Sequence, residues 1–547
     1  MSTNSNFTKE EIRIGNKAFT PTRTTIETAF YGNNVKTVRG LSEAYEMAKS
    51  SPGTITIDQP VFQPEKIGIP KDAKVLLFND GETVGRFAGA RIILGEKGVV
   101  ESDYALLLRE AVYRTRYKTM LHTQAYIGLH EDFMVKANLL VPETYENTLY
   151  NWLLNFQYMN DFYNEMYAGS KRIGDEPDIL IFSDPDWKDD AYPNGLAFFN
   201  PEHNCAALLG LRYFGEHKKG TLTLAWGIAN RNGYVSCHGG MKRMIRKDGR
   251  KYLMAGFGLS GSGKSTITHA RHGGKYDVTI LHDDAYVISV KDGSSVALEP
   301  SYFDKTQDYP PTAPDNKYLI TAQNCGATVD SQGNLVLVTE DIRNGNGRAI
   351  KSKLWAENRV DKFDEPIDTI VWLMKDHTLP PVLKINDPIT ASVMGACLAT
   401  KRTTAEKLLA DVDQDALVFE PYANPFRTYA LEQDYYKFKA LFEDRGVNCY
   451  IINTGHFLEK KIPKEITIEI IESIVDEKAE FIPFGPFANM EYMTVEGFVP
   501  ALGDKEYIGR VKKSMESRLD YLISLREYKG GRDLLPQEAF DVLEALK

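Results

Sequence analysis

The 547-residue sequence predicts a protein of the α/β class, with mixed α+β character and two domains. Three observations support this fold class. A chain of this length exceeds what one hydrophobic core usually holds. Segments with strand-like and helix-like apolar patterns alternate along it. Finally, an apolar strand at 252–257 runs directly into a glycine-rich loop that is followed by the start of a helix, an order typical of nucleotide-binding domains.

The composition is that of a globular enzyme. Hydrophobic residues make up 43% and charged residues 26% of the chain, and the net charge is −10. This acidic balance disfavours a non-specific nucleic-acid binder, which needs a basic face. The polar N-terminus lacks the apolar core of a secretory signal, and no run of about 18 apolar residues predicts a membrane span. We therefore expect a cytoplasmic protein with no nucleic-acid or membrane partner.

The five cysteines are widely scattered and form no C-x-x-C pair. This spacing predicts neither a zinc ribbon nor a disulfide framework, and we expect reduced thiols.

In the first half of the chain, short strands are predicted at 73–81 and 90–95, each bounded by turn residues. A single helix is predicted over 142–168, because Tyr145, Leu149, Trp152 and Phe156 begin an apolar stripe at alternating spacings of four and three. We interpret this aromatic stripe as a core-facing surface rather than a ligand platform.

Further strands are predicted around the glycine-rich loop, at 178–187, within 220–243, at 252–257 and at 276–290. Helices are predicted at 403–412, 431–446 and 464–476, and the last forty residues have a mostly helical pattern. We place the domain boundary at residue 233, which gives domains 1–233 and 234–547.

Gly258–Ser265 reads G-x-x-x-x-G-K-S, the spacing of a loop whose backbone N–H groups surround a polyphosphate. Its glycines allow the backbone to turn and to approach an anion closely. Lys264 would reach the outer phosphates, and the Ser265 hydroxyl would bind Mg²⁺. The predicted phosphate-binding residues are Gly258, Leu259, Ser260, Gly261, Ser262, Gly263, Lys264, Ser265 and Thr266.

Magnesium-dependent phosphoryl transfer also needs a carboxylate at the end of a neighbouring strand. The segment "TILHDD" supplies Asp283 and Asp284, only about twenty residues after Lys264. Such a short interval is unlike common GTPases and helicases. On the local pattern alone, a turn aspartate at a strand end is the alternative.

Three other segments carry candidate residues. "RYFGEHKKG" contains Tyr213, Lys218 and Lys219, and "YVSCHGG" contains His238. Arg86 lies in the glycine-flanked "VGRFAG". Taken one at a time, adjacent lysines are more often a solvated pair, and one histidine is more often a core residue than a ligand.

Together with "FGLSGSGKST" and "LHDD", these segments resemble the ATP-dependent phosphoenolpyruvate carboxykinases. The spacing of nineteen residues from Lys219 to His238 matches the family, as do "NGNGRAI" around Arg348, "LPPV" at 379–382 and "IINTGHFLEKKIPKEIT" at 451–467. All of these segments occur in the order of the family, over residues of about 76 to 490. The resemblance implies a phosphoenolpyruvate-carboxykinase-like fold, with an N-terminal oxo-acid-binding domain before a nucleotide-binding domain.

The resemblance also implies the reaction, in which oxaloacetate and ATP give phosphoenolpyruvate, CO₂ and ADP. The implied catalytic residues are Arg86, Tyr213, Lys218, Lys219, Lys264 and Arg348. Lys219, His238 and Asp284 resemble Mn²⁺ ligands, beside Mg²⁺ on Ser265. Arg348 would offset charge on the γ-phosphate, and Lys461, Ile462 and Thr467 would border the adenine and ribose. We expect small-molecule partners and a monomer or small homo-oligomer.

Several segments depart from the family pattern, which leaves two alternatives open. T-G-R-S-P-K-D-K is here "VGRFAGAR", and T-A-D-A-F-G-V before the "LPPV" segment is here "MKDHT". One alternative is a carboxykinase-like kinase that phosphorylates another small acceptor. The other is a nucleotide-sensing or structural protein without turnover.

Overall fold

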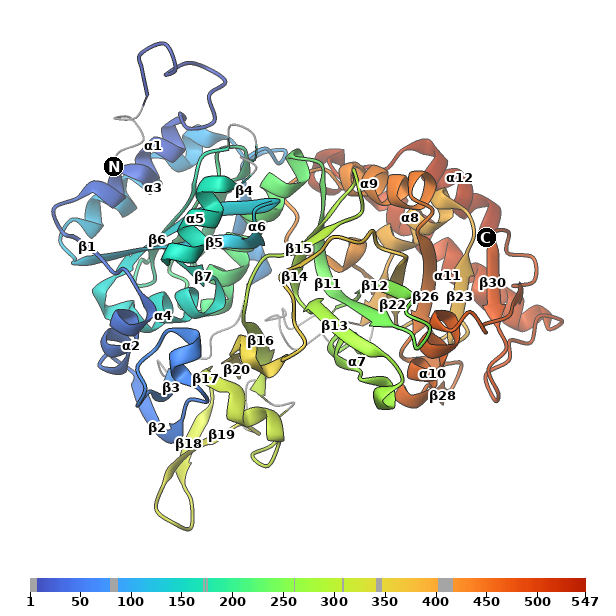
Figure 1. Ribbon diagram of the computed structural model, residues 1–547. Coiled ribbons are helices and arrows are strands. Elements are labelled where there is room, and N and C mark those ends of the chain that lie inside the picture. Colours follow the sequence, from blue (N-terminus) through green and yellow to red (C-terminus); the bar gives the residue numbers. More distant parts are fainter. Residues whose placement is uncertain are drawn as a thin grey trace. The chain divides into compact units, whose positions relative to one another are not determined.

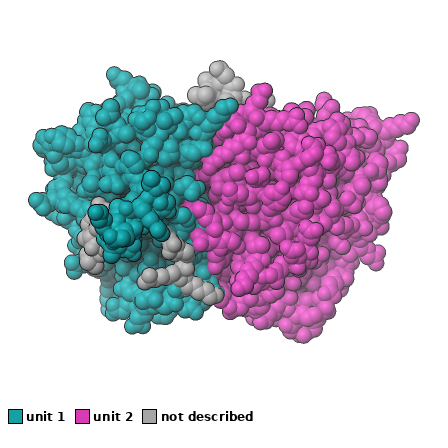
Figure 2. Space-filling model, turned by 90° about the horizontal axis from the view of Figure 1, so that it is seen from above, with its two compact units in different colours: residues 1–228, 298–357, 404–410 teal, residues 229–297, 358–403, 411–547 magenta. Residues whose placement is uncertain are grey.

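The computed structural model describes residues 7–78, 87–170, 173, 176–259, 261–306, 309–340, 347–401 and 417–547. Within them the chain forms two compact units (Figures 1 and 2). The first contains residues 7–228 and 298–357, and the second contains 229–297, 358–401 and 417–547. The mixed α/β fold class is confirmed.

The first unit is built on a mixed sheet, ordered β1-β5-β6-β8-β10-β9-β4 with β7 beside β5. Its strands are β1 (Val35–Thr37), β4 (Arg91–Ile93), β5 (Met120–His130), β6 (Phe133–Pro142), β7 (Gln157–Tyr158), β8 (Ile179–Asp184), β9 (Leu196–Asn200) and β10 (Cys205–Leu209). Its helices are α1 (Pro21–Thr28), α2 (Leu41–Lys49), α3 (Glu101–Thr115), α4 (Glu146–Asn155), α5 (Asp161–Gly169) and most of α6 (Phe214–Arg231). Ile26 of α1 and Leu108 of α3 pack with Phe182 and Phe198 in its core.

A second, smaller sheet of the first unit is assembled from segments far apart in the sequence. Its order is β16-β20-β17-β3-β2. The strands are β2 (Thr54–Pro60), β3 (Lys74–Phe78), β16 (Tyr302–Lys305), β17 (Leu319–Gln323) and β20 (Arg348–Lys351), next to the hairpin of β18 (Gly326–Val329) and β19 (Leu335–Val338). Residues 298–357 thus return to the first unit after the chain has entered the second.

The second unit is built on one large sheet, ordered β21-β15-β14-β11-β12-β22-β26-β23-β30-β29 with β13 beside β11. Its strands are β11 (Tyr234–Ile245), β12 (Lys251–Phe257), β13 (Asp277–His282), β14 (Ala285–Ser289), β15 (Ser295–Ala297), β21 (Lys362–Phe363), β22 (Thr369–Met374), β23 (Val382–Ile385), β26 (Asn448–Asn453), β29 (Phe481–Pro483) and β30 (Met490–Met493). Two ribbons are also present, β24 (Ala399–Lys401) with β25 (Leu417–Phe419) and β27 (His456–Phe457) with β28 (Lys460–Lys461). The central strands β12, β22 and β26 are parallel to one another, so their carboxyl ends lie at one edge.

The helices of the second unit are α7 (Lys264–His269), α8 (Pro388–Ala396), α9 (Leu431–Asp444), α10 (Lys464–Val475), α11 (Lys505–Ser524) and α12 (Gln537–Leu546). Helix α8 packs against α9 and α12 (Figure 1). Between α9 and the sheet, Trp372 of β22 lies with its ring 5.2 Å from Phe257 and 5.1 Å from Phe438, measured between centroids. This aromatic cluster packs β22 against β12, the strand that leads to the glycine-rich loop.

The predicted helices at 431–446 and 464–476 are confirmed as α9 and α10, and the predicted strand at 252–257 is β12. Three predictions were wrong in detail. The helix expected over 142–168 is two helices, because Phe156 is extended (ψ 173°) and Gln157 and Tyr158 pair with β5. Residues 276–290 form two strands that separate at Asp283 and Asp284. The segment 220–231, expected as strand, belongs to the buried helix α6.

The chain first passes from one unit to the other after Ile228, close to the expected boundary at 233. The predicted helix at 403–412 lies outside the described residues. No helix in the described part of the chain combines the length and the apolar composition needed to cross a membrane.

Candidate active site

The glycine-rich loop connects the end of β12 to the start of α7. A Cβ on Gly258 would overlap the Ser262 hydroxyl and lie 2.9 Å from Cβ of Leu373, so a larger residue does not fit there. Gly261 (φ +80°) and Gly263 (φ +84°) have left-handed backbone conformations that favour glycine. Gly263 is also the N-cap of α7, which begins at Lys264. The glycines at these positions therefore follow from the path of the backbone.

Ser262 gives this loop a feature that fits an anion. Its side chain is buried, and its Oγ has no hydrogen-bond partner among the described residues. A buried hydroxyl is normally paired, because leaving it unpaired costs about 1–3 kcal/mol. The unpaired hydroxyl and the missing Cβ atoms leave room and hydrogen-bonding capacity at the loop, which suits the phosphate groups of a nucleotide.

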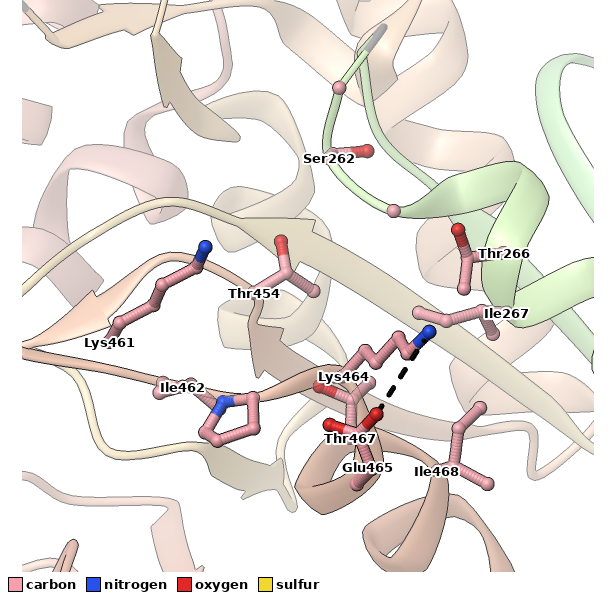
Figure 3. Close-up of a pocket in the computed structure, with 13 residues that line it drawn as sticks. Ser262, Thr266, Ile267, Thr454, Lys461, Ile462, Lys464, Glu465, Thr467 and Ile468 are labelled. Carbon is pink, nitrogen blue, oxygen red and sulfur yellow. Dashed lines mark ion pairs between the residues drawn. The ribbon is translucent and has the colours of Figure 1, made fainter. Parts of the chain in front are cut away.

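A pocket of about 490 Å³ opens beside the loop (Figure 3). Its lining comes from two segments that are about 190 residues apart in the sequence. They contribute Gly261, Ser262, Gly263, Thr266 and Ile267 from the loop and α7, and Thr454, Lys461, Ile462, Pro463, Lys464, Glu465, Thr467 and Ile468 from the turn before α10 and its first residues. The volume is within the range of small-molecule sites. Lys461, Ile462 and Thr467, three residues expected near the nucleoside, thus share a pocket with the loop.

The pocket is at the edge where the parallel strands β12, β22 and β26 end. Lys375 follows β22, and Thr454 follows β26. A Cβ on Gly263 would lie 3.9 Å from Cγ2 of Thr454, and one on Gly455 would lie 3.4 Å from Cα of Lys375. Ligands of open α/β sheets bind outside the carboxyl ends of the parallel strands, so this location agrees with a ligand site.

His238 and Asp284 form a pair that suits a divalent cation. Nε2 of His238 lies 3.0 Å from Oδ1 of Asp284. Nδ1 of the same ring lies 2.5 Å from the carbonyl oxygen of Ala423, which can only accept, so Nδ1 is the donor. In the neutral ring, Nε2 then presents a lone pair toward the carboxylate. A cation between these atoms, or a proton on Nε2, makes the arrangement favourable.

Asp283, the first carboxylate of the pair after β13, faces α7. Oδ2 of Asp283 lies 3.2 Å from Nε2 of His269, the last residue of that helix. Burial alone would raise the pKa of Asp283. The hydrogen bond and charge of His269, together with the charges of His282 and Lys264, outweigh burial, so the pKa lies below its ordinary value. Asp283 therefore carries its negative charge close to the phosphate-binding loop.

Among the described residues, no group of three or more His, Cys, Asp or Glu side chains is arranged to hold a metal ion. Two of the four predicted metal ligands, His238 and Asp284, do lie together in the second unit. Ser265 is at the start of α7 in the same unit, and Lys219 belongs to the first unit.

The glycines after His238 allow α7 to pack closely on β11. A Cβ on Gly240 would overlap the Thr268 hydroxyl, and a Cβ on Gly239 would lie 2.8 Å from the carbonyl oxygen of Gly256. "CHGG" therefore joins a candidate ligand to two positions that must be small. His238 lies on β11, and the loop follows its paired neighbour β12, so the two strands together position the loop, α7 and His238.

The first unit holds the other predicted residues. Lys218 is fully buried, with Nζ 3.0 Å from Oε1 of Glu299, and Asn155 donates from Nδ2 to the other carboxylate oxygen at 2.5 Å. Nζ of Lys219 lies 5.7 Å from the centroid of the Trp226 ring.

Tyr213 and Arg348 complete this group. Tyr213 is buried, and its ring leaves no space for a Cβ on Gly215. Arg348 is buried on β20, where it donates to the carbonyl of Gly347 at 2.9 Å. Arg86 and Ser260 lie outside the described residues.

Comparisons with known proteins show the family to which this chain belongs. A family model described as phosphoenolpyruvate carboxykinase matches residues 94–497, well over half of the chain. The chain belongs to the ATP-dependent phosphoenolpyruvate carboxykinase family. A curated protein named phosphoenolpyruvate carboxykinase (ATP), from Aeropyrum pernix, is 26% identical over 288 residues, 51% of this chain. The chain spans 57% of the length of that relative.

Membership of this carboxykinase family agrees with a site that uses ATP and divalent metal ions. It also agrees with the sequence motifs, since the matched region includes the glycine-rich loop, His238, the two aspartates and the segment before α10.

Sequence reasoning missed several residues of the pocket lining, including Thr454, Lys464 and Glu465, and it missed Lys375, which lies beside Gly261 and Gly455. Thr454 is part of "IINTGHF", a segment that supports the family resemblance but in which this threonine was given no role. The periodicity of α10 does not reveal that Lys464 and Glu465 at its start line the pocket. Lys375 could be noticed only as a departure from the family pattern.

Proposed function

We propose that this carboxykinase-family protein converts oxaloacetate and ATP into phosphoenolpyruvate, CO₂ and ADP. The observation that supports this most directly is the pocket shared by the glycine-rich loop and residues 454–468, in a chain that the family model matches over 94–497. The pocket suits a nucleotide, and the choice of oxaloacetate as the second substrate is inferred from the family.

The reaction has two coupled parts. The bond between C3 of oxaloacetate and its carboxylate breaks, CO₂ leaves, and the electron pair forms an enolate. The enolate oxygen then attacks the γ-phosphorus of ATP, and ADP leaves with the electrons of the broken P–O bond. Negative charge develops first on the enolate and then on the transferring phosphoryl group, so the site must place cations at both locations.

In this proposal the second unit binds the nucleotide. Backbone N–H groups of the loop would hold the phosphates, Lys264 would neutralise their charge, and the hydroxyl of Ser265 would bind Mg²⁺. Ile462 and Thr467 border the nucleoside, and Lys461 at the pocket rim adds positive charge. The buried hydroxyl of Ser262 gains a partner when phosphate is bound.

His238, Asp284 and Lys219 are the proposed Mn²⁺ ligands. The hydrogen bond from Nδ1 of His238 to Ala423 orients the ring so that Nε2 points toward Asp284, and such a second hydrogen bond is usual for a ligating histidine. When bound, the metal ion would offset the negative charge of the enolate and the phosphoryl group. Lys219 can take part only as the neutral amine.

The remaining candidate residues would bind the oxo acid or stabilise the charge that develops during the reaction. Arg86 would bind a substrate carboxylate through its guanidinium fork, and Tyr213 would contact the substrate or the departing CO₂. Lys218, which is buried with Nζ 3.0 Å from Oε1 of Glu299, would bridge the enolate oxygen and the oxygens of the transferring phosphoryl group. Arg348 would offset charge on the γ-phosphate during transfer.

The test is formation of phosphoenolpyruvate by the purified protein with oxaloacetate, ATP, Mg²⁺ and Mn²⁺. Lys264→Ala and His238→Ala should each lower the rate by a factor of at least about 100, because each removes transition-state charge stabilisation. Oxaloacetate decays spontaneously, so the product rather than CO₂ must be measured.

Two results would contradict the proposal. Phosphoenolpyruvate formation at the same rate in both variants would exclude this site. ATP binding without any phosphoenolpyruvate would mean that the acceptor is different, in agreement with the altered "VGRFAGAR" segment, and other small hydroxy and oxo acids should then be tested as acceptors.

A further inference from the structure

Lys375 is the first residue after β22, the parallel strand next to β12. The glycine-rich loop follows β12, so Lys375 and the loop leave the sheet at the same edge. The backbone of Lys375 is held in place by its own hydrogen bond and by the residue that follows it. The N–H of Lys375 donates to the carbonyl of Ala399 at 3.0 Å, and the next residue, Asp376, is buried in an ion pair with Arg518.

The side chain of Lys375 reaches the loop. Its Nζ lies 3.7 Å from the position that a Cβ on Gly261 would occupy. Gly261 lines the pocket, and its N–H belongs to the predicted phosphate cradle. Because Gly261 has no side chain, the ammonium group approaches the backbone of the loop directly. On the other side, Gly455 lies against the Cα and Cβ of Lys375, so this residue is placed between the two segments that line the pocket.

We propose that Lys375 is a second phosphate-contacting cation of this site, in addition to Lys264, and that it strengthens binding of nucleotides with a polyphosphate chain. This inference rests on the proposed nucleotide site. A lysine is suited to this task, because its compact ammonium contacts phosphate oxygens as a point charge. The segment "MKDHT", which contains Lys375, is one of those that depart from the family pattern.

The other charged residues near the pocket do not by themselves neutralise a polyphosphate. Lys464 lies 4.0 Å from Glu465, measured between Nζ and Oε1, and this pairing offsets part of its charge (Figure 3). Asp283 and Asp284 add negative charge in the same unit. A nucleoside triphosphate is itself strongly anionic, so a further cation beside the loop favours binding.

The experiment is calorimetric titration of ATP and AMP into the full-length protein and its Lys375→Met and Lys375→Arg variants. Lys375→Met should raise the Kd for ATP about tenfold, since one close charge pair is lost, and change the Kd for AMP less than about twofold. Lys375→Arg keeps the charge and should bind ATP within about threefold of wild type. Lys513→Met, an exposed lysine on α11, is the matched control and should bind as wild type does.

Unchanged ATP affinity in Lys375→Met would overturn the inference, as would an equal loss of ATP and AMP affinity, which would indicate general damage to the pocket. Melting temperatures without nucleotide check that each variant is folded, and Lys375→Gln carries the same expectation if the Met variant is not. A wild-type protein that binds ATP and makes no phosphoenolpyruvate would contradict the proposed reaction and leave this inference intact. A wild-type protein that does not bind ATP would overturn both.

Discussion

Among single residues, Gly258 is important because the glycine-rich loop can pack only if this position has no side chain. Gly258 leaves β12 at a point where the Ser262 side chain and Leu373 of β22 occupy the space of a Cβ. The three residues belong to one packed unit, and any side chain at 258 must push either the loop or the strand away. Since the loop also holds the proposed phosphate site, we expect packing and binding to be lost together.

Gly258→Ala should therefore destabilise the second unit by about 1–3 kcal/mol, the usual cost of overpacking, and weaken ATP binding at least tenfold. Urea unfolding and ATP titration measure the two effects. Gly503→Ala is the matched control, because a Cβ there meets no atom within 4 Å. Equal stability and affinity of the two variants would contradict the role given to Gly258.

The residues of the loop and its neighbours were predictable from the sequence to different degrees. The loop itself has a spacing with a physical meaning, so Gly258 to Ser265 could be identified directly. The association of His238 with Asp284 was implied only by the family resemblance, because no local pattern shows the pairing of β11 with β14 that brings the two side chains together. Lys375 was not predictable as a contact of Gly261, since the two residues are 114 positions apart in the sequence. Only the parallel pairing of β12 with β22 brings them together.

At the scale of elements, α7 is short and depends on its surroundings. Lys242 of β11 is buried beneath it and donates from Nζ to the carbonyl of Ile267 at 2.6 Å and to Nε2 of His272 at 2.8 Å. Nδ1 of His272 lies 3.0 Å from Oε1 of Glu472 on α10. This chain of hydrogen bonds connects the end of the loop helix with the helix that follows the pocket.

Burial lowers the pKa of Lys242 to about 7, against the opposing charge of Glu472. Between pH 7 and its ordinary pKa of 10.5, the unfolded chain holds one proton more at this residue than the folded chain. The contribution of Lys242 to stability therefore rises with pH in this window, by at most about 1.4 kcal/mol per pH unit.

Lys242→Met should remove this part of the pH dependence. The measurement is the free energy of unfolding of both proteins at several values between pH 7 and pH 10. Other titrating groups, such as Lys437, whose burial lowers its pKa to about 8, are common to both and cancel in the difference. Parallel curves for the two proteins would show that Lys242 does not titrate in this range.

Helix α11 supports the same edge of the sheet. Arg518 lies with its guanidinium 2.9 Å from Oδ2 of Asp376, and both side chains are buried. Burial raises the pKa of Asp376, but the charge of Arg518 and hydrogen bonds from Ser514 and Thr378 lower it more, so the carboxylate stays charged. This pair fixes the residue directly after Lys375.

Arg518→Met should destabilise the protein by about 3–5 kcal/mol, because it leaves the Asp376 charge buried without its partner. Arg510→Met on the same helix removes an exposed pair with Glu506 and should cost no more than about 0.5 kcal/mol. Urea unfolding of the two variants tests the difference. Similar losses of unfolding free energy in both variants would mean that the buried pair stabilises the protein no more than the exposed pair does.

The sequence predicted elements with clear periodicity and failed where burial removes it. Helices α9 and α10 have one apolar face and were found. Helix α6 is buried on nearly all sides, and its Thr221-Leu222-Thr223-Leu224 run alternates as a strand does. Since periodicity cannot separate a buried helix from a strand in such a run, the tertiary environment decides.

At the scale of the whole molecule, the path of the chain is more complex than two successive domains. Residues 298–357 join the first unit after the chain has built β11 to β15 of the second. No local pattern marks such a return, because it depends on pairing between β17 and β3, which are more than 200 residues apart. The assignment of oxo acid to the first unit and nucleotide to the second stays a prediction.

The central claim is that one protein joins decarboxylation to phosphoryl transfer from ATP. Its most direct test is incubation with ATP labelled in the γ-phosphate and with oxaloacetate, followed by separation of the products. We expect label in phosphoenolpyruvate, dependent on oxaloacetate and on a divalent metal ion, and lost in Lys264→Ala. Label that stays in ATP, or that appears only as inorganic phosphate, would show that this protein does not transfer the γ-phosphate to the enolate.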